Sequence, residues 1–466
     1  MSHAPIEVDV AAIGTGQATP SLATTLASRG ESVVVFERGL VGGTCVNVGC
    51  TPTKTLRKTA RVAHMARRAG DFGVRVGSVE VDVAAAMARV QKVVESSRRG
   101  LEGWLGATPG LRLVRERAFF DGRHGGRFIV RAGAEEFHAA RVYLNVGTRP
   151  LVPAIEGLAD ARPLTNETIL ALRDAPTHLI VIGGSYIGLE FAQIFRRLGS
   201  AVTVLQPSGA IASRETPDIS ARLTTMLEAE GIRIITGAAI QRVTRDAGGA
   251  VRVELGHGEA AVDGAEILVA TGRIPNTDGL GLDSVGLKLD AQGYVPVDGS
   301  LATGVPGIWA LGDVNRRGAF THTSWQDHEI VIANLSGGHR TVDGRITTYA
   351  MYTDPPLGRI GMDERGARAA MEHGRRFLFA EHEMSRVSRA TEEGETIGVI
   401  KVLVDAETHR FAGVTMLGIN ADEIVQVIAG QMAADAPYEV LRDFLPVHPT
   451  VTEFLPTILG KLKPLV

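Results

Sequence analysis

The chain has 466 residues, of which 44% are hydrophobic and 22% charged, and its formal net charge is −3. This composition is typical of a globular protein large enough for about three domains. No strongly basic block points to nucleic acid as the main partner, and no apolar run of about 18 residues predicts a membrane span. The richest basic stretch, 54–68, is interpreted as a solvated helix face, with an anion-attracting patch as the alternative.

Cysteine usage indicates the cellular compartment. Cys45 and Cys50 are the only cysteines, whereas a secreted protein stapled by disulfides would normally use more. The first ten residues lack the basic start and apolar core of a signal peptide. We therefore expect a cytoplasmic protein that keeps both cysteines for chemistry.

The N-terminal segment predicts a dinucleotide-binding unit. An apolar strand over 8–13 leads into a loop with Gly14 and Gly16, followed by a helix over 18–29 and a strand ending at Glu37. Glycines let the backbone approach a pyrophosphate at the start of the helix. Glu37 lies 21 positions after Gly16, close to the roughly 20 expected for an acid that binds a ribose.

The same pattern returns later in the chain. A strand over 179–182 precedes Gly183 and Gly188, then a helix over 190–198 and a strand over 201–205. The position equivalent to Glu37 is Gln206, a neutral amide, so an acid that would repel a 2′-phosphate is missing. We therefore expect two nucleotide sites and a tilt toward NADPH over NADH. Arg214 could bind the phosphate, or it could form a structural ion pair.

The remaining segments predict how the units are joined. Strand-and-turn segments over 142–153 and 267–275 indicate the crossings into and out of the second unit. Alternating strands over 398–404 and 411–417, with a helix over 421–434, indicate a separate C-terminal α+β domain.

The strongest motif is the segment 42–54, GGTCVNVGCTPTK. Cys45 and Cys50 are spaced to close a small disulfide ring if the backbone bends. Cys50 should lie near a helix N-terminus, where the dipole stabilises a thiolate, with Lys54 on the same face. The alternatives are two buried small side chains or half of a zinc site, but a zinc site normally needs four ligands. We expect no metal site.

These residues resemble the class I pyridine nucleotide-disulfide oxidoreductases, the family of dihydrolipoamide dehydrogenase, glutathione reductase and mercuric reductase. The segments TGRIPN at 271–276, LGD at 311–313 and HPT at 448–450 match further family motifs. The resemblance covers nearly the whole chain and implies an α/β fold with two Rossmann-like domains plus a C-terminal α+β dimerisation domain. The implied ranges are 1–150 and 273–345 for FAD, 151–272 for NAD(P), and 346–466 for dimerisation.

The resemblance also implies roles for single residues. Cys50 would be the charge-transfer thiolate against the flavin, and Cys45 would exchange with the substrate. Lys54 would pair with Glu190 near the flavin. His448, oriented by Glu453, would be the acid–base supplied by the partner subunit of a homodimer. The implied cofactor-binding residues are Gly14, Gly16, Glu37, Gly43, Thr44, Lys54, Gly147 and Asp313 for FAD, and Gly183, Tyr186, Gly188, Gln206, Arg214 and Gly272 for NAD(P)H. In simpler interpretations Tyr186 is ordinary packing and Glu190 a helix carboxylate.

The expected function is electron transfer from NAD(P)H through FAD to the cysteine pair and on to a small disulfide, an oxidant or a metal ion. The chain lacks the second cysteine pair of mercuric reductases, which argues against an efficient mercury relay because soft thiolates capture soft metals. Dihydrolipoamide dehydrogenase and a flavin-binding subunit without enzymatic activity are the alternatives.

Overall fold

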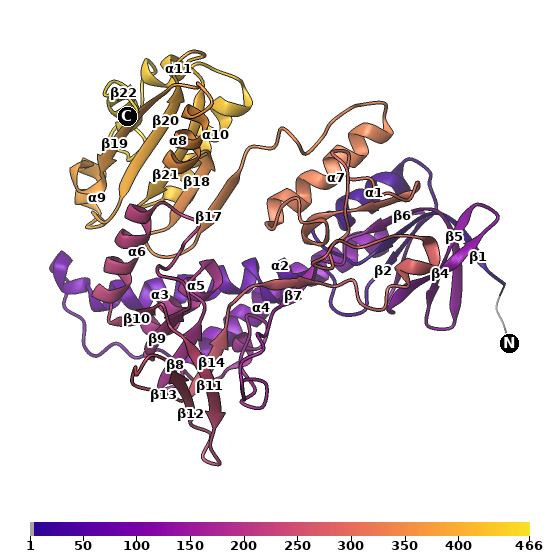
Figure 1. The fold of residues 1–466 in the computed structure, drawn as a ribbon, viewed down its shortest axis with the longest axis horizontal. Helices are drawn as coiled ribbons and strands as arrows, with labels where there is room; N and C mark the ends of the chain where they lie inside the picture. Colours follow the sequence, from indigo (N-terminus) through magenta and orange to yellow (C-terminus); the bar gives the residue numbers. More distant parts are fainter. Residues whose placement is uncertain (1–3) are drawn as a thin grey trace.

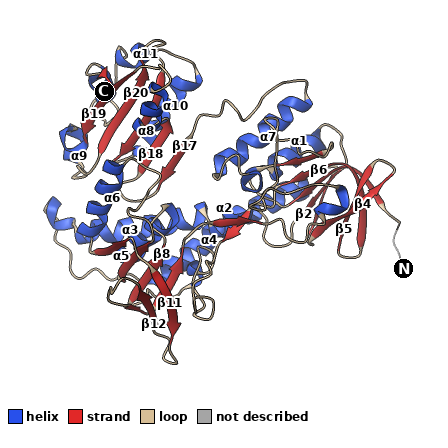
Figure 2. Cartoon of the chain, viewed as in Figure 1, coloured by secondary structure: helices blue, strands red, loops and turns tan. Residues whose placement is uncertain are grey.

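The computed structural model describes residues 4–466 as three units, each built on its own β-sheet (Figure 1). The N-terminal unit and the C-terminal unit lie at opposite ends of the longest axis, and the second unit lies below the C-terminal one (Figures 1 and 2). The predicted α/β architecture is confirmed. None of the helices within residues 4–466 has both the length and the apolarity needed to cross a bilayer.

The first unit is a mixed sheet with the strand order β3-β2-β1-β6-β5-β4, and β16 pairs with β6. Its strands are β1 (Ile6–Ile13), β2 (Val33–Phe36), β3 (Leu111–Val114), β4 (Ala118–His124), β5 (Arg127–Ala132), β6 (Glu135–Leu144) and β16 (Ile308–Ala310), and its helices are α1 (Thr19–Ser28), α2 (Gly43–Val48) and α7 (Thr321–Leu335). Side chains alternate along β1: Val10 and Ala12 pack with α1 and α7, whereas Ala11 and Ile13 face the core under β4 and β5. The sheet is therefore covered on both faces.

The second unit repeats this arrangement with a parallel sheet of order β10-β9-β8-β14. Its elements are β8 (His178–Ile182), α5 (Tyr186–Leu198), β9 (Ala201–Gln206), α6 (Pro217–Ala229), β10 (Ile232–Thr236) and β14 (Glu266–Val269), with a meander of β11 (Ile240–Arg245), β12 (Val251–Leu255) and β13 (Val262–Gly264) on the other face. Two short antiparallel strands, β7 (Thr148–Pro150) and β15 (Arg273–Pro275), form the double crossing between the units.

The C-terminal unit is a six-stranded antiparallel sheet of order β17-β18-β21-β20-β19-β22. Its elements are β17 (Thr348–Met351), β18 (Leu357–Gly361), α8 (Glu364–Met371), β19 (Phe377–Glu383), α9 (Ser388–Glu392), β20 (Val399–Asp405), β21 (Phe411–Leu417), α10 (Ala421–Ala433), α11 (Tyr438–Arg442), α12 (Phe454–Leu459) and β22 (Lys463–Pro464).

Short 3-10 helices occur in all three units. They are η1 (Ala69–Phe72), η2 (Ile169–Ala171), η3 (Leu282–Val285), η4 (Gly312–Asn315) and η5 (Met384–Arg386).

Two long helices link the first unit to the second. The helices α3 (Cys50–Arg67) and α4 (Val83–Ala107) lie within the range assigned to the first domain from the sequence. Leu56 of α3 and Val90 of α4 nevertheless share one apolar core with Leu189 and Phe195 of α5. The helix that begins at Cys50 therefore packs on the second unit.

The basic stretch on α3 is a correction to the sequence interpretation. Arg57 and Arg61 form ion pairs with Asp354, whose side chain is only 3% exposed, and Arg61 and Arg68 also contact Glu395 at 3.3 and 3.6 Å. The prediction that this stretch is a solvated helix face was wrong for these arginines, because carboxylates of the C-terminal unit pack against this face of α3. Lys58 is exposed, as a solvated face would have it.

Candidate functional site

The first glycine loop lies between β1 and the N-terminus of α1. Gly14 has φ +92°, and a Cβ there would overlap the backbone of Asn145, while one on Gly16 would overlap its side chain. No acidic residue occupies the first turn of α1, so no negative charge there opposes the attraction of the helix dipole for a phosphate. Gly43, at φ +60°, begins α2 beside the same loop, since a Cβ there would lie 3.2 Å from Gly16 Cα. This cradle fits the pyrophosphate of a dinucleotide.

Asn145, which the sequence did not single out, fixes the position of this loop. It is 4% exposed, accepts from the Thr19 backbone N–H and hydroxyl at 3.3 Å, and donates to the Leu311 carbonyl at 2.7 Å. Glu37 directly follows β2, and its carboxylate accepts from Thr15 N at 3.0 Å and from Gly39 N at 2.8 Å. Glu37 thus lies at the loop, as an acid that binds a ribose would.

The crossing strands bring Asp313 to the same edge of the first unit. Asp313 is in η4 and accepts from the Thr148 hydroxyl at 3.1 Å. Burial raises the pKa of this carboxyl, although the charge of Arg273 opposes the rise. Arg273 donates to the Thr148 hydroxyl and carbonyl, each at 2.7 Å, and lies 3.5 Å from the Thr44 hydroxyl. Gly147 and Gly272 flank the crossing with φ values of +63° and +143°.

The second glycine loop has the same construction. A Cβ on Gly183 would overlap the Ala270 carbonyl, and one on Gly188 would overlap the Gly183 carbonyl, so α5 packs closely on β8. Gln206 accepts from Gly184 N at 2.7 Å. Arg214 is exposed and makes no hydrogen bond or ion pair with any residue in the described range 4–466. The structure therefore does not show the structural ion pair that was the alternative for Arg214.

The two cysteines face each other across the junction of α2 and α3, and both are free thiols in this structure. A hydrogen bond from the Cys45 thiol, aided by Thr321 and Lys54, lowers the pKa of Cys50 to about 6, although burial opposes this. The same hydrogen bond, together with burial, raises the pKa of Cys45 above its usual range. Cys50 therefore loses its proton more readily than Cys45 does.

Thr321 is a second residue that the sequence did not reveal. Its hydroxyl lies 3.1 Å from Cys50 Sγ, and it is the first residue of α7. Cys50 is the first residue of α3, so the N-termini of two helices, 18 and 15 residues long, meet at one sulfur atom. Both helix dipoles favour a negative charge there.

Lys54 and Glu190 form an ion pair at 2.7 Å, one turn of α3 after Cys50. The Glu190 side chain is 7% exposed, and it also accepts from Tyr352 N at 2.8 Å. The Lys54 ammonium lies 4.5 Å from the centre of the Tyr352 ring. This ion pair joins α3, which begins at Cys50, to α5, the helix that follows the second glycine loop.

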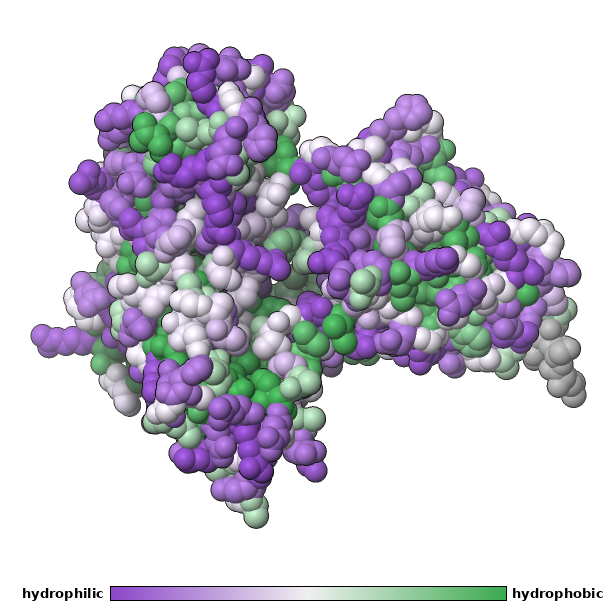
Figure 3. All heavy atoms as spheres, in the orientation of Figure 1, coloured by the Kyte–Doolittle hydropathy of each residue, from purple (hydrophilic) through white to green (hydrophobic). Residues whose placement is uncertain are grey.

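His448 and Glu453 form a pair at the C-terminal unit, with 2.9 Å between His448 Nδ1 and Glu453 Oε2. The Glu453 side chain is only 13% exposed, whereas that of His448 is 77% exposed. No hydrogen bond or ion pair among residues 4–466 joins His448 to the cysteines. Figure 3 shows a hollow between the C-terminal unit and the first unit.

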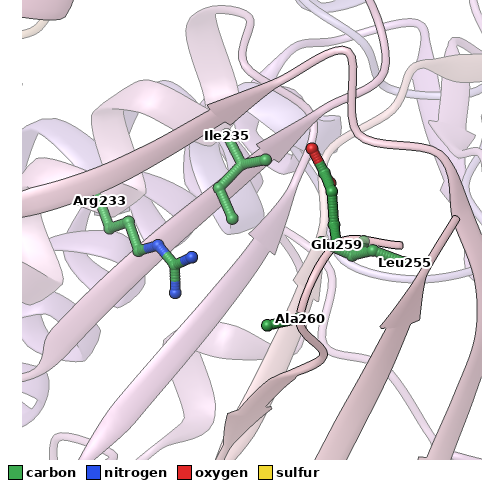
Figure 4. A pocket seen from close by; sticks show the side chains of 5 residues that line it. All are labelled: Arg233, Ile235, Leu255, Glu259 and Ala260. Atoms are coloured by element: carbon green, nitrogen blue, oxygen red, sulfur yellow. The ribbon is translucent and has the colours of Figure 1, made fainter. Parts of the chain in front are cut away.

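A pocket of about 190 Å³ lies elsewhere, between β10 and the loop after β12 (Figure 4). Arg233 and Ile235 line one side, and Leu255, Glu259 and Ala260 the other. It contains neither a nucleophile nor any residue of the glycine loops, so it is not the redox site. Within the described chain, no three His, Cys, Asp or Glu side chains gather in a way that could hold a metal ion.

Comparisons with known proteins agree with this geometry. The family model of pyridine nucleotide-disulphide oxidoreductases matches residues 8–327, and the dimerisation-domain model of that family matches residues 347–458. The probable pyridine nucleotide-disulfide oxidoreductase RclA of Escherichia coli (strain K12) is 34% identical over 97% of this chain and 98% of its own length. A mercuric reductase of Streptomyces lividans is 34% identical over 91% of this chain and 90% of its own.

Solved structures of the RclA relative are similar over the whole fold. The HOCl-induced flavoprotein disulfide reductase RclA of Escherichia coli superposes with a TM-score of 0.87 at 32% identity, covering 98% of this chain and 100% of that one. Its Cu(II) complex gives the same TM-score, identity and coverage. Because the family model covers more than half of the chain and the relatives nearly all of it, this protein belongs to the class I pyridine nucleotide-disulfide oxidoreductases, flavoenzymes that use FAD and NAD(P)H.

Proposed function

We propose that this protein uses NAD(P)H to reduce a small disulfide or a comparable oxidant at the Cys45–Cys50 pair. The observation that carries the proposal is the difference between the two sulfurs. The pKa of Cys50 is lowered to about 6 and that of Cys45 is raised, so one sulfur stays next to the cofactor as a thiolate while the other keeps a proton to exchange. A pair of structural cysteines has no need of such a difference.

The residues around the first glycine loop fit FAD. Gly14, Gly16, Gly43 and Thr44 would cradle its phosphates, Glu37 its ribose and Asp313 its ribityl chain, with Gly147 and Lys54 at the flavin. When bound, FAD supplies the two-electron relay from NAD(P)H to the cysteine disulfide. Gly183, Gly188 and Gly272 would hold the nucleotide, and Tyr186 would cover its nicotinamide pocket. Gln206 and Arg214 would favour the 2′-phosphate of NADPH.

The cysteines carry the second half-reaction by thiol–disulfide exchange. Cys45 loses its proton to His448 of the partner subunit, and its sulfur attacks one sulfur of the acceptor disulfide. The acceptor's S–S bond breaks, and its leaving thiolate takes the proton back from the imidazole. Cys50 then attacks the Cys45 sulfur, which closes the Cys45–Cys50 disulfide and releases the second acceptor thiolate. Two electrons have moved to the acceptor.

The histidine requires a second copy of the chain in this proposal. The His448 side chain is 77% exposed, and no hydrogen bond or ion pair within residues 4–466 joins it to the cysteines of its own chain. Nearby side chains are also unusually exposed for their type, with Leu445 at 94% and Val447 at 76%. A homodimer with a two-fold axis would bury this apolar rim and bring each histidine to the other chain's cysteines. We propose the domain ranges 1–150, 151–272, 273–345 and 346–466 for this assembly.

A metal ion is the second candidate acceptor. It is favoured by one relative being a mercuric reductase and by another having been solved with Cu(II). Against it stands the presence of only two cysteines to capture a soft ion. Dihydrolipoamide dehydrogenase is less well supported, because Gln206 occupies the position of the acid that would select NADH.

An acceptor screen tests the proposal. The purified holoenzyme is mixed with NADPH and, in parallel, with small disulfides, quinones, Hg(II) and Cu(II), and NADPH oxidation is followed. We expect turnover with at least one disulfide, abolished in Cys45→Ser, while NADPH still bleaches the flavin in that variant. Turnover with metal ions alone would favour the second candidate. Absence of flavin bleaching in the wild type would leave only a flavin-binding role.

A further inference from the structure

Glu215 is a buried carboxylate with an unusual set of partners. It is 2% exposed and lies in the loop between β9 and α6. The hydroxyls of two tyrosines donate to the same oxygen, Tyr186 at 3.0 Å and Tyr349 at 2.7 Å. Arg359 reaches the other oxygen at 3.3 Å. Burial, with Glu215 as the next cause, raises the pKa of both tyrosines, so both phenols remain protonated donors.

The partners of Glu215 differ in how firmly they are held. Tyr349 and Arg359 are cross-strand neighbours on β17 and β18, and Arg359 donates to the Tyr349 hydroxyl at 3.1 Å. Arg359 is also fixed by Asp363 at 2.9 Å. Tyr186, in contrast, is the first residue of α5, directly after the second glycine loop, and its ring is only partly buried. One partner of the carboxylate can therefore move while the others stay.

We propose that Glu215 is a latch that holds Tyr186 closed over the nicotinamide pocket, and that the Tyr186–Glu215 hydrogen bond must break before the nicotinamide can enter. This inference rests on the proposed NAD(P)H reaction and on the position of Tyr186 at the second glycine loop. Glu215 is a positioning residue in this proposal, since it acts through Tyr186.

The remaining partners of Glu215 keep the free-energy cost of moving Tyr186 low, although the closed state is still held by several contacts. A buried carboxylate that lost all its partners would cost several kcal/mol. When Tyr186 leaves, Glu215 keeps Tyr349 and Arg359, so only one hydrogen bond is lost. In the closed state the Tyr186 ring also contacts Tyr349 and Phe320, with ring centres 5.5 and 6.3 Å apart. The closed lid lowers the fraction of competent sites and so weakens the apparent affinity for the nucleotide.

A pair of matched variants tests the latch. Tyr186→Phe keeps the ring but removes the movable hydroxyl, and Tyr349→Phe removes a hydroxyl from the same Glu215 oxygen on the fixed side. Flavin reduction by NADPH is measured in the stopped flow at increasing nucleotide concentration. We expect Tyr186→Phe to lower the apparent Kd about tenfold, which corresponds to about 1.4 kcal/mol. Tyr349→Phe should keep the wild-type Kd.

The outcomes separate the latch from the function on which it rests. If NADPH does not reduce the wild type, the proposed function fails. If the wild type is reduced and Tyr186→Phe has an unchanged or higher apparent Kd, the latch is refuted and the function stands. The same holds if Tyr349→Phe lowers the Kd as much as Tyr186→Phe, because the effect would then come from the packing of the aromatic cluster.

Discussion

The Cys50 thiolate gives the most direct quantitative prediction. Replacing Thr321 by valine keeps the shape of the side chain and removes the hydroxyl that lies 3.1 Å from Cys50 Sγ. The hydrogen bond from Cys45 is the largest cause of the low pKa of Cys50, about 6, and the Thr321 hydroxyl adds to it. A hydrogen bond to a charged group is worth about 1.5 kcal/mol, and one pKa unit is about 1.4 kcal/mol. The pKa of Cys50 should therefore rise by about one unit.

A higher pKa of Cys50 lowers the fraction of thiolate at neutral pH, and this fraction can be measured. Above the Cys50 pKa the sulfur is a thiolate, so at pH 7 a rise of one unit lowers the thiolate fraction from about nine-tenths to about one-half. The assay is a pH titration of the long-wavelength absorbance that a thiolate gives beside bound flavin in the two-electron-reduced holoenzyme. Thr321→Ser should restore the wild-type titration, and Cys50→Ser should abolish the band. An unchanged midpoint in Thr321→Val, or a band that survives Cys50→Ser, would refute the reasoning.

Three further predictions concern the nucleotide, the assembly and the fold. The wild type should prefer NADPH, and Gln206→Glu or Arg214→Ala should shift the ratio of kcat/KM values toward NADH by about tenfold, or about 1.4 kcal/mol; a wild type that already favours NADH tenfold contradicts this. Exchange of subunits between Cys45→Ser and His448→Ala dimers should restore partial activity, because each mixed dimer has one intact site. Confirmed exchange without any return of activity would contradict a site shared between subunits. Asp354→Asn should lower the free energy of unfolding by about 1.5–3 kcal/mol in denaturant titrations, because the buried guanidinium of Arg197 loses the Asp354 charge and keeps only that of Glu230.

The glycine loops and the cysteine motif could be predicted because each is a local feature of the chain. A tight turn needs glycine whatever surrounds it, and the two cysteines, in α2 and at the start of α3, are neighbours in sequence as well as in space. Gln206 illustrates the limit of such reasoning. From the sequence it was simply a missing acid, but its amide oxygen accepts from Gly184 N and so orders the loop itself.

The residues that the sequence did not reveal meet their partners only through the fold. Thr321 lies 271 positions after Cys50, and Tyr349 lies 134 positions after Glu215. Nothing in the local sequence around a single threonine or glutamate distinguishes it from a surface residue. Asn145 is similar, since its role depends on β6 lying beside β1 in the sheet.

The basic stretch on α3, which was predicted to be solvated, connects residues that are local in the sequence to partners that are distant in it. Lys54, Arg57 and Arg61 are spaced by three and four positions, so they share one face of the helix, which spans 18 residues or about 27 Å. At its N-terminus that helix meets α7 at Cys50, one turn on it meets α5 at Lys54, and further on it meets the C-terminal unit at Asp354. One rigid element therefore contacts all three units. Because Cys50 begins this helix, its position relative to α5 depends on the Lys54–Glu190 pair and on the apolar core that α3 shares with α5. Loss of the Lys54–Glu190 pair should therefore disturb the redox site from one helical turn away.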